Sequence, residues 1–271
     1  MRYLHIEVNS QSSELPAFVG SMLRGAFGVS LKDVVCINPS FKCDGCFGAG
    51  NCLYYDFFEA KKRFHSFRLD IGLYPKDLRF GIYLFNEASK KYPYILSALH
   101  RMLTQKGLGK DRKKYAIDSI TIDGKRVYEA GEFKQIQIEP KNFKIDNFCR
   151  KVKLQLITPL RIKREGRFVK ADNLDIKDIL VSIYKKRLFY DGECERIEQF
   201  PRVSHKALSM IDFTRYSNRQ KTKMKIGGII GEMVVEGLSP QTYEMLRFGE
   251  IAGVGKLGTF GLGKIVVKDL E

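Results

Sequence analysis

The hydrophobic and polar positions in the first half of the chain predict a regular order of strands and helices. Residues 3–8 alternate between apolar and polar side chains, as in a strand with one buried face. Residues 15–35 carry apolar side chains such as Leu23 and Phe27 at the spacing of an amphipathic helix, with Pro16 near its start. Later patterns predict strands at 67–74 and 79–86, a helix at 89–106, and strands near 115–122 and 133–139.

The second half repeats this order. It predicts an opening strand in which Val152, Leu154 and Leu156 alternate with polar residues, a helix at 174–189, strands near 204–217 and 225–236, a helix at 240–248 capped by Ser239, and a last strand at 265–267. Two consecutive βαββαβ units predict an α+β protein built from tandem ferredoxin-like (RRM-like) domains. We place these domains at residues 1–145 and 146–271, with the boundary in the polar stretch 140–149.

A glycine-rich segment lies just before the last predicted strand. Residues 253–264 read GVGKLGTFGLGK, with five glycines, two lysines and no acidic side chain. Glycine adopts backbone angles that other residues avoid, so interleaved lysine would give a loop of accessible N–H donors in a positive field. Such a loop suits a phosphodiester chain. The alternative is an ordinary glycine-rich turn.

The charge balance favours a polyanionic partner. Lys and Arg number 47 against 31 Asp and Glu, a formal net charge of +16, and nucleic acid is the leading candidate. A membrane partner is disfavoured because the sequence has no long uncharged apolar segment. The first ten residues alternate like a strand and do not resemble a signal peptide, so we expect a cytoplasmic protein.

Four segments, taken together in this order, resemble one family. They are LPAFVGSMLRGAFGVSLKDVVC, CDGCFGAGNCLYYDFFE, RYSNRQKTKMKIGGIIGEM and the glycine-rich tail. The combination is similar to the precursor CRISPR RNA processing endoribonucleases of the RAMP superfamily, the "Cas six" family. The resemblance touches both halves of the chain.

The resemblance implies two adjacent ferredoxin-like domains, with the glycine-rich loop of the second against the first helix of the first. CRISPR repeat RNA would then follow a basic seam between them. A stripe on the predicted first helix, Arg24 and Lys32 four residues either side of Gly28, supplies one set of phosphate contacts. The loop supplies the other: Gly253, Gly255, Lys256, Gly261, Gly263 and Lys264. For Arg24, an ordinary surface salt bridge is the alternative.

The segment 215–225 interleaves basic, aromatic and polar residues. Guanidinium and aromatic planes stack on unpaired bases and lysines neutralise phosphates, so this composition favours RNA contact. The alternative is a solvated edge strand protected by lysines. The residues that we expect at RNA are Arg215, Tyr216, Arg219, Gln220, Lys221 and Lys223.

Four of the six cysteines cluster as C-x6-C-x2-C-x5-C. They are Cys36, Cys43, Cys46 and Cys52, in a loop insertion at 36–52. Four thiolates can satisfy tetrahedral zinc, and structural disulfides are rare in the cytosol. We therefore predict a structural zinc, with an iron–sulfur cluster, disulfides or unligated thiols as alternatives.

The sequence offers no compact carboxylate cluster that could hold two catalytic cations, so we expect no catalytic metal. The reaction implied by the resemblance is attack of a ribose 2′-hydroxyl on the adjacent phosphate. Acid and base groups must then come from the protein. The candidates are His65 in a basic stretch, then His205, with Tyr54 assisting or only packing; His5 and His100 are expected to be structural.

The chain departs from the family at one position. Members often carry His immediately before the Val-Gly-Lys of the tail, where this chain has Gly253. The main alternative is therefore a noncatalytic RAMP subunit that holds crRNA in an effector complex with other CRISPR subunits. A third alternative, a basic metal-binding scaffold for proteins or lipid, leaves the segment 215–225 and the tail unexplained.

Overall fold

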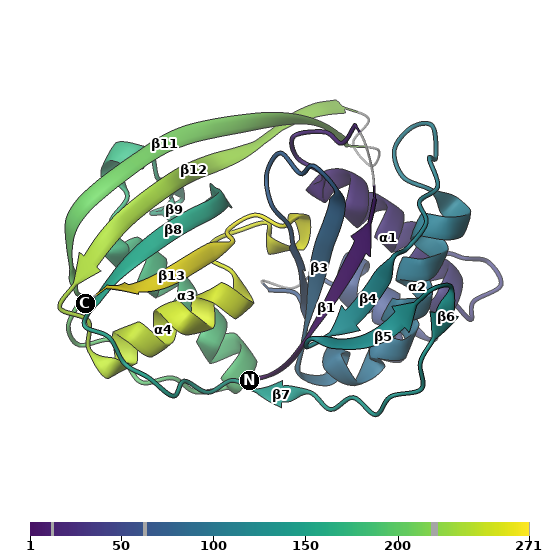
Figure 1. The fold of residues 1–271 in the computed structure, drawn as a ribbon, viewed down its shortest axis with the longest axis horizontal. Coiled ribbons are helices and arrows are strands. Elements are labelled where there is room, and N and C mark those ends of the chain that lie inside the picture. The colour runs from purple at the N-terminus through teal and green to yellow at the C-terminus, as the bar shows by residue number, and fades with distance from the viewer. Residues whose placement is uncertain (12–13, 62–63, 218–221, 271) are drawn as a thin grey trace. The chain divides into compact units, whose positions relative to one another are not determined.

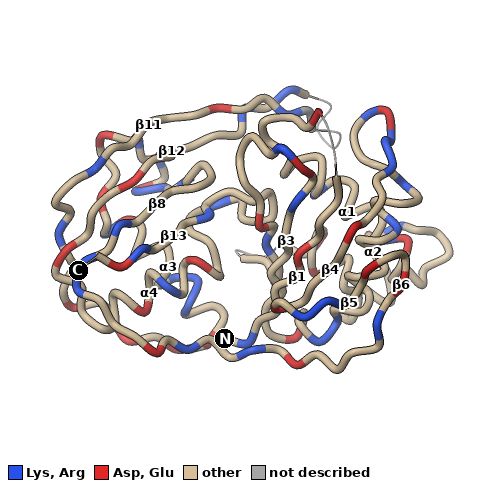
Figure 2. Tube along the Cα trace, viewed as in Figure 1, with Lys and Arg blue, Asp and Glu red and all other residues tan. Residues whose placement is uncertain are grey.

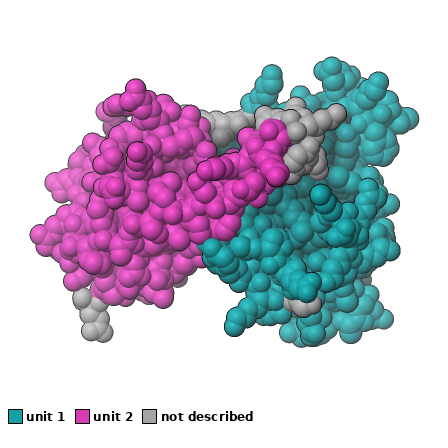
Figure 3. All heavy atoms as spheres, turned by 90° about the horizontal axis from the view of Figure 1, so that it is seen from above, with its two compact units in different colours: residues 1–142 teal, residues 143–271 magenta. Residues whose placement is uncertain are grey.

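The computed structural model describes residues 1–11, 14–61, 64–217 and 222–270. The chain forms two compact units, Met1–Asn142 and Phe143–Glu271 (Figures 1 and 3). The division lies inside the polar stretch 140–149 in which the sequence placed a boundary. Each unit is a mixed α/β structure with an antiparallel sheet.

Unit 1 contains two helices and a sheet in the order β2-β3-β1-β4-β5-β6, with β7 also paired to β1. The strands are β1 (Arg2–Ser10), β2 (Phe67–Asp70), β3 (Leu78–Phe85), β4 (Ser119–Ile122), β5 (Lys125–Glu129), β6 (Glu132–Phe133) and β7 (Lys141–Asn142). The helices are α1 (Gly20–Val35) and α2 (Tyr92–Arg101), and the unit also has the short helical turns η1 (Ala49–Asn51), η2 (Tyr55–Glu59), η3 (Asn86–Lys91) and η4 (Met102–Lys106).

The core of unit 1 follows from its two periodicities. On β1 every second residue is buried, including Leu4, Ile6 and Val8, as the alternation predicted. On α1 the buried face carries Leu23, Phe27 and Leu31 at three-to-four spacing. Burial of such side chains stabilises the unit by about 1.5–3 kcal/mol each.

Two predictions for unit 1 were wrong in detail. The first helix begins at Gly20 and not near residue 15. The carbonyl of Ala17 accepts a hydrogen bond from the backbone N–H of Tyr74 instead of from a residue in a helical turn. The strand predicted at 133–139 is not formed beyond Phe133; β4 pairs instead with β5, which the sequence did not predict. The reason is a tight turn at Asp123 and Gly124, both with positive φ (49° and 84°), which reverses the chain at once.

Unit 2 contains a sheet in the order β11-β12-β8-β13 and a separate pair, β10-β9. Its strands are β8 (Lys151–Leu160), β9 (Lys163–Arg164), β10 (Arg167–Phe168), β11 (Arg202–Ser217), β12 (Thr222–Glu236) and β13 (Ile265–Leu270). Its helices are α3 (Ile176–Asp191) and α4 (Pro240–Ala252), with short turns η5 (Ala171–Asn173) and η6 (Gly258–Phe260). The hairpin of β11 and β12 forms a long ribbon (Figure 1).

Both helices of unit 2 begin at side-chain caps. The Asp175 carboxylate accepts from the N–H of Lys177 at 2.8 Å at the start of α3. Ser239 Oγ accepts from the N–H of Thr242 at 3.2 Å at the start of α4, as the sequence predicted. The helix then continues to Ala252, four residues beyond the predicted end at 248. The glycine-rich loop therefore begins directly at the end of α4, with Gly253.

Candidate functional site

The glycine-rich loop in unit 2 joins the end of α4 to the start of β13. Gly253, Gly255, Gly261 and Gly263 all have positive φ, between 68° and 82°. A side chain would collide at two of them. A Cβ on Gly255 would lie 2.6 Å from the carbonyl oxygen of Arg161, and one on Gly263 would lie 1.8 Å from that of Val254. Glycine is required here because the backbone folds tightly against itself.

The expectation that the loop offers a row of accessible N–H donors is wrong for much of its length. The loop is instead bonded to its own unit. The donors, with their acceptors, are Val254 to Gly263 O (2.8 Å), Gly255 to Ser182 Oγ (2.9 Å), Lys256 to Arg161 O (2.9 Å), Gly261 to Gly258 O (2.8 Å), Gly263 to Pro159 O (3.2 Å) and Lys264 to Thr158 Oγ1 (2.9 Å). The loop is therefore a preorganised platform, and contacts to an anion would come mainly from its side chains.

Basic and aromatic side chains meet on this platform. Lys256 is exposed and Lys264 is half-buried. The Arg215 guanidinium lies 4.8 Å from the centre of the Phe260 ring, so it joins β11 to the loop. In the sequence, the segment 215–225 and the loop are separate motifs, and Phe260 was not among the expected RNA contacts. The signal that could have identified Phe260 was its position as an aromatic residue inside a glycine-rich segment.

The rest of the segment 215–225 is described only in part. Tyr216 on β11 pairs in register with Lys223 on β12, which is exposed. Arg219, Gln220 and Lys221 lie outside the described residues. Their predicted contacts to RNA stay predictions.

In unit 1, the predicted basic stripe on α1 lies against an aromatic segment. The Arg24 guanidinium is 5.0 Å from the centre of the Phe58 ring, and the Lys32 Nζ is 4.9 Å from that of Tyr54. Between them, a Cβ on Gly28 would lie 3.1 Å from the Phe58 ring. The glycine thus lets the ring approach the helix. The sequence missed Phe58, although it lies close after the tyrosine pair in LYYDFFE.

Tyr54 is held as a neutral phenol. Its hydroxyl donates to Glu59 Oε1 at 3.3 Å. Burial, followed by the negative charge of Glu59, raises the pKa of Tyr54 to about 12. At neutral pH this side chain can therefore donate a hydrogen bond or a proton, but it is not a base.

The two candidate histidines lie in different units. His65 belongs to unit 1, where its ring is 6.4 Å from that of Phe67. Phe67 stacks in turn on Phe57 and contacts Phe58, so an aromatic cluster links His65 to the α1 stripe. His205 is exposed on β11 of unit 2. The structure thus brings His65 and Tyr54 into one unit.

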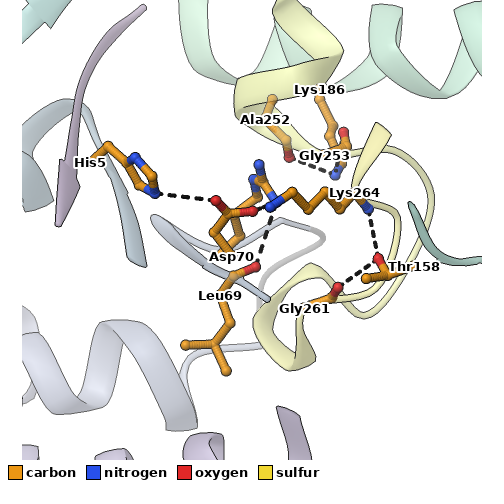
Figure 4. Close-up of polar contacts among 10 residues, drawn as sticks. His5, Leu69, Asp70, Thr158, Lys186, Ala252, Gly253, Gly261 and Lys264 are labelled. Carbon is orange, nitrogen blue, oxygen red and sulfur yellow. Dashed lines mark hydrogen bonds and ion pairs between the residues drawn. The ribbon is translucent and has the colours of Figure 1, made fainter. Parts of the chain in front are cut away.

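The other two histidines pack as expected for structural residues. His5 Nε2 lies 3.3 Å from Asp70 Oδ2 (Figure 4), and the His5 ring stacks on Tyr83 with centres 4.0 Å apart. The His100 ring meets Tyr128 edge-on at 5.6 Å.

The four clustered cysteines, Cys36, Cys43, Cys46 and Cys52, line a single cavity of about 360 Å³ in unit 1. All are half-buried free thiols. Tyr54, Lys42 and Lys91 line the same cavity. Among the described residues, however, no three His, Cys, Asp or Glu side chains are grouped so that they could hold a metal ion. The thiols therefore share one cavity without forming a ready ligand set.

Charge is spread over both units. Lys and Arg positions occur along each unit, interspersed with Asp and Glu (Figure 2). Some of the lysine and arginine side chains form ion pairs, such as Lys106 with Asp33 at 2.6 Å and Lys153 with Glu232 at 2.9 Å. Because such partly exposed pairs contribute about 0–1 kcal/mol each, they bear little on the fold.

Comparison with known families identifies the class of protein. Residues 154–265 match the family model of the CRISPR-associated endoribonuclease Cas6, and residues 1–141 match a family model described as the AF_1859_N N-terminal domain. Residues 154–265 are therefore similar to the Cas6 endoribonuclease family. The resemblance read from the sequence is thereby confirmed.

Solved Cas6 structures share this fold across nearly the whole chain. The product complex of Cas6 (TTHB231), from Thermus thermophilus, is 16% identical with a TM-score of 0.61, covering 98% of each chain. The product complex of Cas6 (TTHA0078) is 14% identical with a TM-score of 0.59, covering 99% of this chain and 100% of that one. The substrate mimic complex of the same Cas6 is 15% identical with a TM-score of 0.52, and it covers 99% of this chain and 100% of that one. A comparison with curated proteins gave no significant match.

Within the part of the chain that the structure describes, no helix combines the length and the apolar character that crossing a membrane requires.

Proposed function

We propose that the protein binds CRISPR repeat RNA and cleaves precursor crRNA within the repeats, without a catalytic metal ion. The observation that carries the proposal is the platform of unit 2, where Arg215 of β11 packs on Phe260 of the preorganised loop and the same loop carries the exposed Lys256. This platform lies in the region that matches the Cas6 model. Guanidinium, aromatic and ammonium groups in one place suit a single RNA strand, whose bases stack and whose phosphates need neutralising.

The architecture supports the proposal. Each unit has the element order βαββαβ, and the strands of each core sheet follow the same spatial order, β2-β3-β1-β4 in unit 1 and β11-β12-β8-β13 in unit 2. We infer tandem ferredoxin-like domains, an N-terminal one with the cysteine-rich insertion and a C-terminal one with the glycine-rich loop. Similar solved chains are titled as product and substrate mimic complexes, which is in keeping with an RNA ligand.

The reaction is an attack by the ribose 2′-hydroxyl on the adjacent phosphate, and it leaves a 2′,3′-cyclic phosphate and a 5′-hydroxyl. The protein must align the attacking oxygen, move a proton from it and another to the leaving oxygen, and stabilise the phosphoryl charge. We assign proton transfer to His65. Tyr54, a neutral donor at working pH, and the cations Arg24 and Lys32 stabilise the phosphoryl oxygens.

A noncatalytic crRNA-binding subunit is the second candidate, and one observation favours it. Gly253, which stands where relatives often carry His, has a φ of 68° at the point where α4 ends. A left-handed backbone strains a side chain there, so this position serves the turn. Such a subunit would hold RNA beside other CRISPR proteins in the cytoplasm.

Incubation of the pure protein with a labelled CRISPR repeat in EDTA separates these functions. We expect one discrete cut, with a product that carries a cyclic phosphate. We also expect binding to weaken steeply with salt, because phosphate neutralisation releases counterions. A shifted but intact RNA would favour the noncatalytic subunit, and absence of both cut and shift would refute RNA binding altogether.

We further propose that the cysteine-rich insertion binds a structural zinc ion. No residue from 32 to 56 is buried, so this segment has no core of its own. Its four thiols nevertheless face one cavity. Small segments without a core commonly depend on a metal or disulfides. Because the thiols do not form a ready ligand set, zinc binding would require Cys36, Cys43, Cys46 and Cys52 to turn toward one point.

Metal analysis of protein purified without chelator tests this site. We expect about one equivalent of zinc, which four thiolates bind as a closed tetrahedral site. Cys43→Ser removes one ligand and should lose most of the metal. Cys194→Ser, in the other unit, should retain it. A wild-type content below about half an equivalent of zinc or iron would eliminate the metal site.

A further inference from the structure

The start of the glycine-rich loop is held by a buried lysine. Lys186 on α3 is 5% exposed, and its Nζ donates to the carbonyl oxygens of Ala252 and Gly253, at 2.9 Å each (Figure 4). Ala252 is the last residue of α4, and Gly253 is the first of the loop. Carbonyls at a helix C-terminus lack intrahelical partners and lie at the negative end of the helix dipole. An ammonium group at this point satisfies both needs.

The end of the loop is held by a buried threonine on β8. The Thr158 hydroxyl donates to the carbonyl oxygen of Gly261 at 2.8 Å and accepts from the N–H of Lys264 at 2.9 Å (Figure 4). Its side chain is fully buried. One hydroxyl therefore uses its donor and acceptor capacity to join both sides of the turn that precedes β13.

These contacts do more than fill space. Burying an ammonium or a hydroxyl costs free energy that an apolar side chain of similar size would avoid. Lys186 instead fixes the path of the backbone. It holds the carbonyls of Ala252 and Gly253 where the chain leaves α4, at the point where Gly253 has a positive φ. Ser182, one turn earlier on α3, accepts from the N–H of Gly255 at 2.9 Å. With both ends fixed, the segment that carries Lys256 and Phe260 is held in one place.

We propose that Lys186 and Thr158 are positioning residues that hold the glycine-rich loop in the shape that binds RNA. The proposal rests on the proposed function of RNA binding. Neither side chain contacts RNA: each acts through the backbone of the loop. Their loss should therefore loosen the loop first and weaken RNA binding as a consequence.

Hydrogen exchange of the full-length protein measures the first effect without RNA. In Lys186→Met, we expect the amides of residues 254–256 to exchange about tenfold faster or more, because local opening becomes easier. In Thr158→Val, which keeps the shape but removes the hydroxyl, the amides of Gly263 and Lys264 should respond in the same way. Amides of β11 and β12 away from the loop should keep their protection. Thr158→Ser should restore the wild-type pattern.

Binding of a labelled CRISPR repeat measures the second effect. We expect Lys186→Met and Thr158→Val to weaken the affinity about tenfold, equivalent to 1.4 kcal/mol. Lys185→Met is the matched control, because it removes the same charge from an exposed position on α3 and should have little effect. Thr158→Ser should bind like the wild type.

The outcomes separate the two proposals. Uniformly faster exchange throughout unit 2 would mean a general loss of stability and would overturn the positioning role. Unchanged exchange and unchanged affinity would overturn it as well. If the wild type does not bind the repeat while exchange rises only in the loop, RNA binding is refuted, and the holding of the loop by Lys186 and Thr158 stands. If Lys186→Met does not fold, the exchange and binding measurements on Thr158→Val and Thr158→Ser test the positioning role instead.

Discussion

Replacement of Gly263 by Ala is expected to unfold the glycine-rich loop and to abolish tight RNA binding. A Cβ here would lie 1.8 Å from the carbonyl oxygen of Val254, which is a backbone atom and cannot turn away. The φ of 73° adds about 1–2 kcal/mol of strain for any other residue. We expect the free energy of unfolding to fall by about 3–5 kcal/mol, and RNA affinity to fall by about a hundredfold. Thermal unfolding and repeat binding measure the two effects.

Gly237→Ala is the matched control in the same unit. Gly237 has nearly the same φ, 75°, but apart from its own chain neighbours no heavy atom lies within 4 Å of the position that its Cβ would occupy. It should therefore show the backbone strain alone, about 1–2 kcal/mol, and leave RNA binding unchanged. If the two variants lose equal stability, the close approach to Val254 is not the reason for glycine at position 263.

Replacement of His65 by Ala is expected to remove cleavage while RNA binding persists. General acid–base catalysis by a positioned side chain contributes about 10²- to 10⁴-fold, so the single-turnover rate should fall by that factor. Affinity for the repeat should change little, because the platform of unit 2 is untouched. The measurement is the rate of cyclic-phosphate formation with saturating protein in EDTA.

His205→Ala provides the comparison, since His205 is an exposed side chain on a different unit. If His65→Ala cleaves at the wild-type rate and His205→Ala does not, proton transfer belongs to His205. If both variants retain full activity, neither histidine is catalytic, and Tyr54 with Lys32 becomes the next pair to replace. The melting temperature of each variant must match the wild type before rates are compared.

The sequence selected several of the candidate site residues, but it did not predict which side chains they contact. Arg24 and Lys32 were found from helical spacing, and the structure adds their aromatic partners Phe58 and Tyr54. Arg215 was selected for its composition, and its contact with Phe260 depends on how far β11 extends beside the loop. The four cysteines were grouped correctly, but their spacing said nothing of the 360 Å³ cavity around which they are arranged.

The sequence by itself determined the βαββαβ order of the core elements in both units, the basic and glycine-rich character of the tail, and the resemblance to the Cas6 family. These properties can be read locally, because side chains two, three or four positions apart define one face of a strand or helix. Only the tertiary structure decided how the glycines are used. Gly255 and Gly263 are needed because another backbone segment approaches within the space of a methyl group. Most of the N–H groups of the loop are satisfied by residues 158–161, by α3 and by the loop itself. Such contacts arise from strand pairing and packing between residues distant in sequence, which no local pattern records.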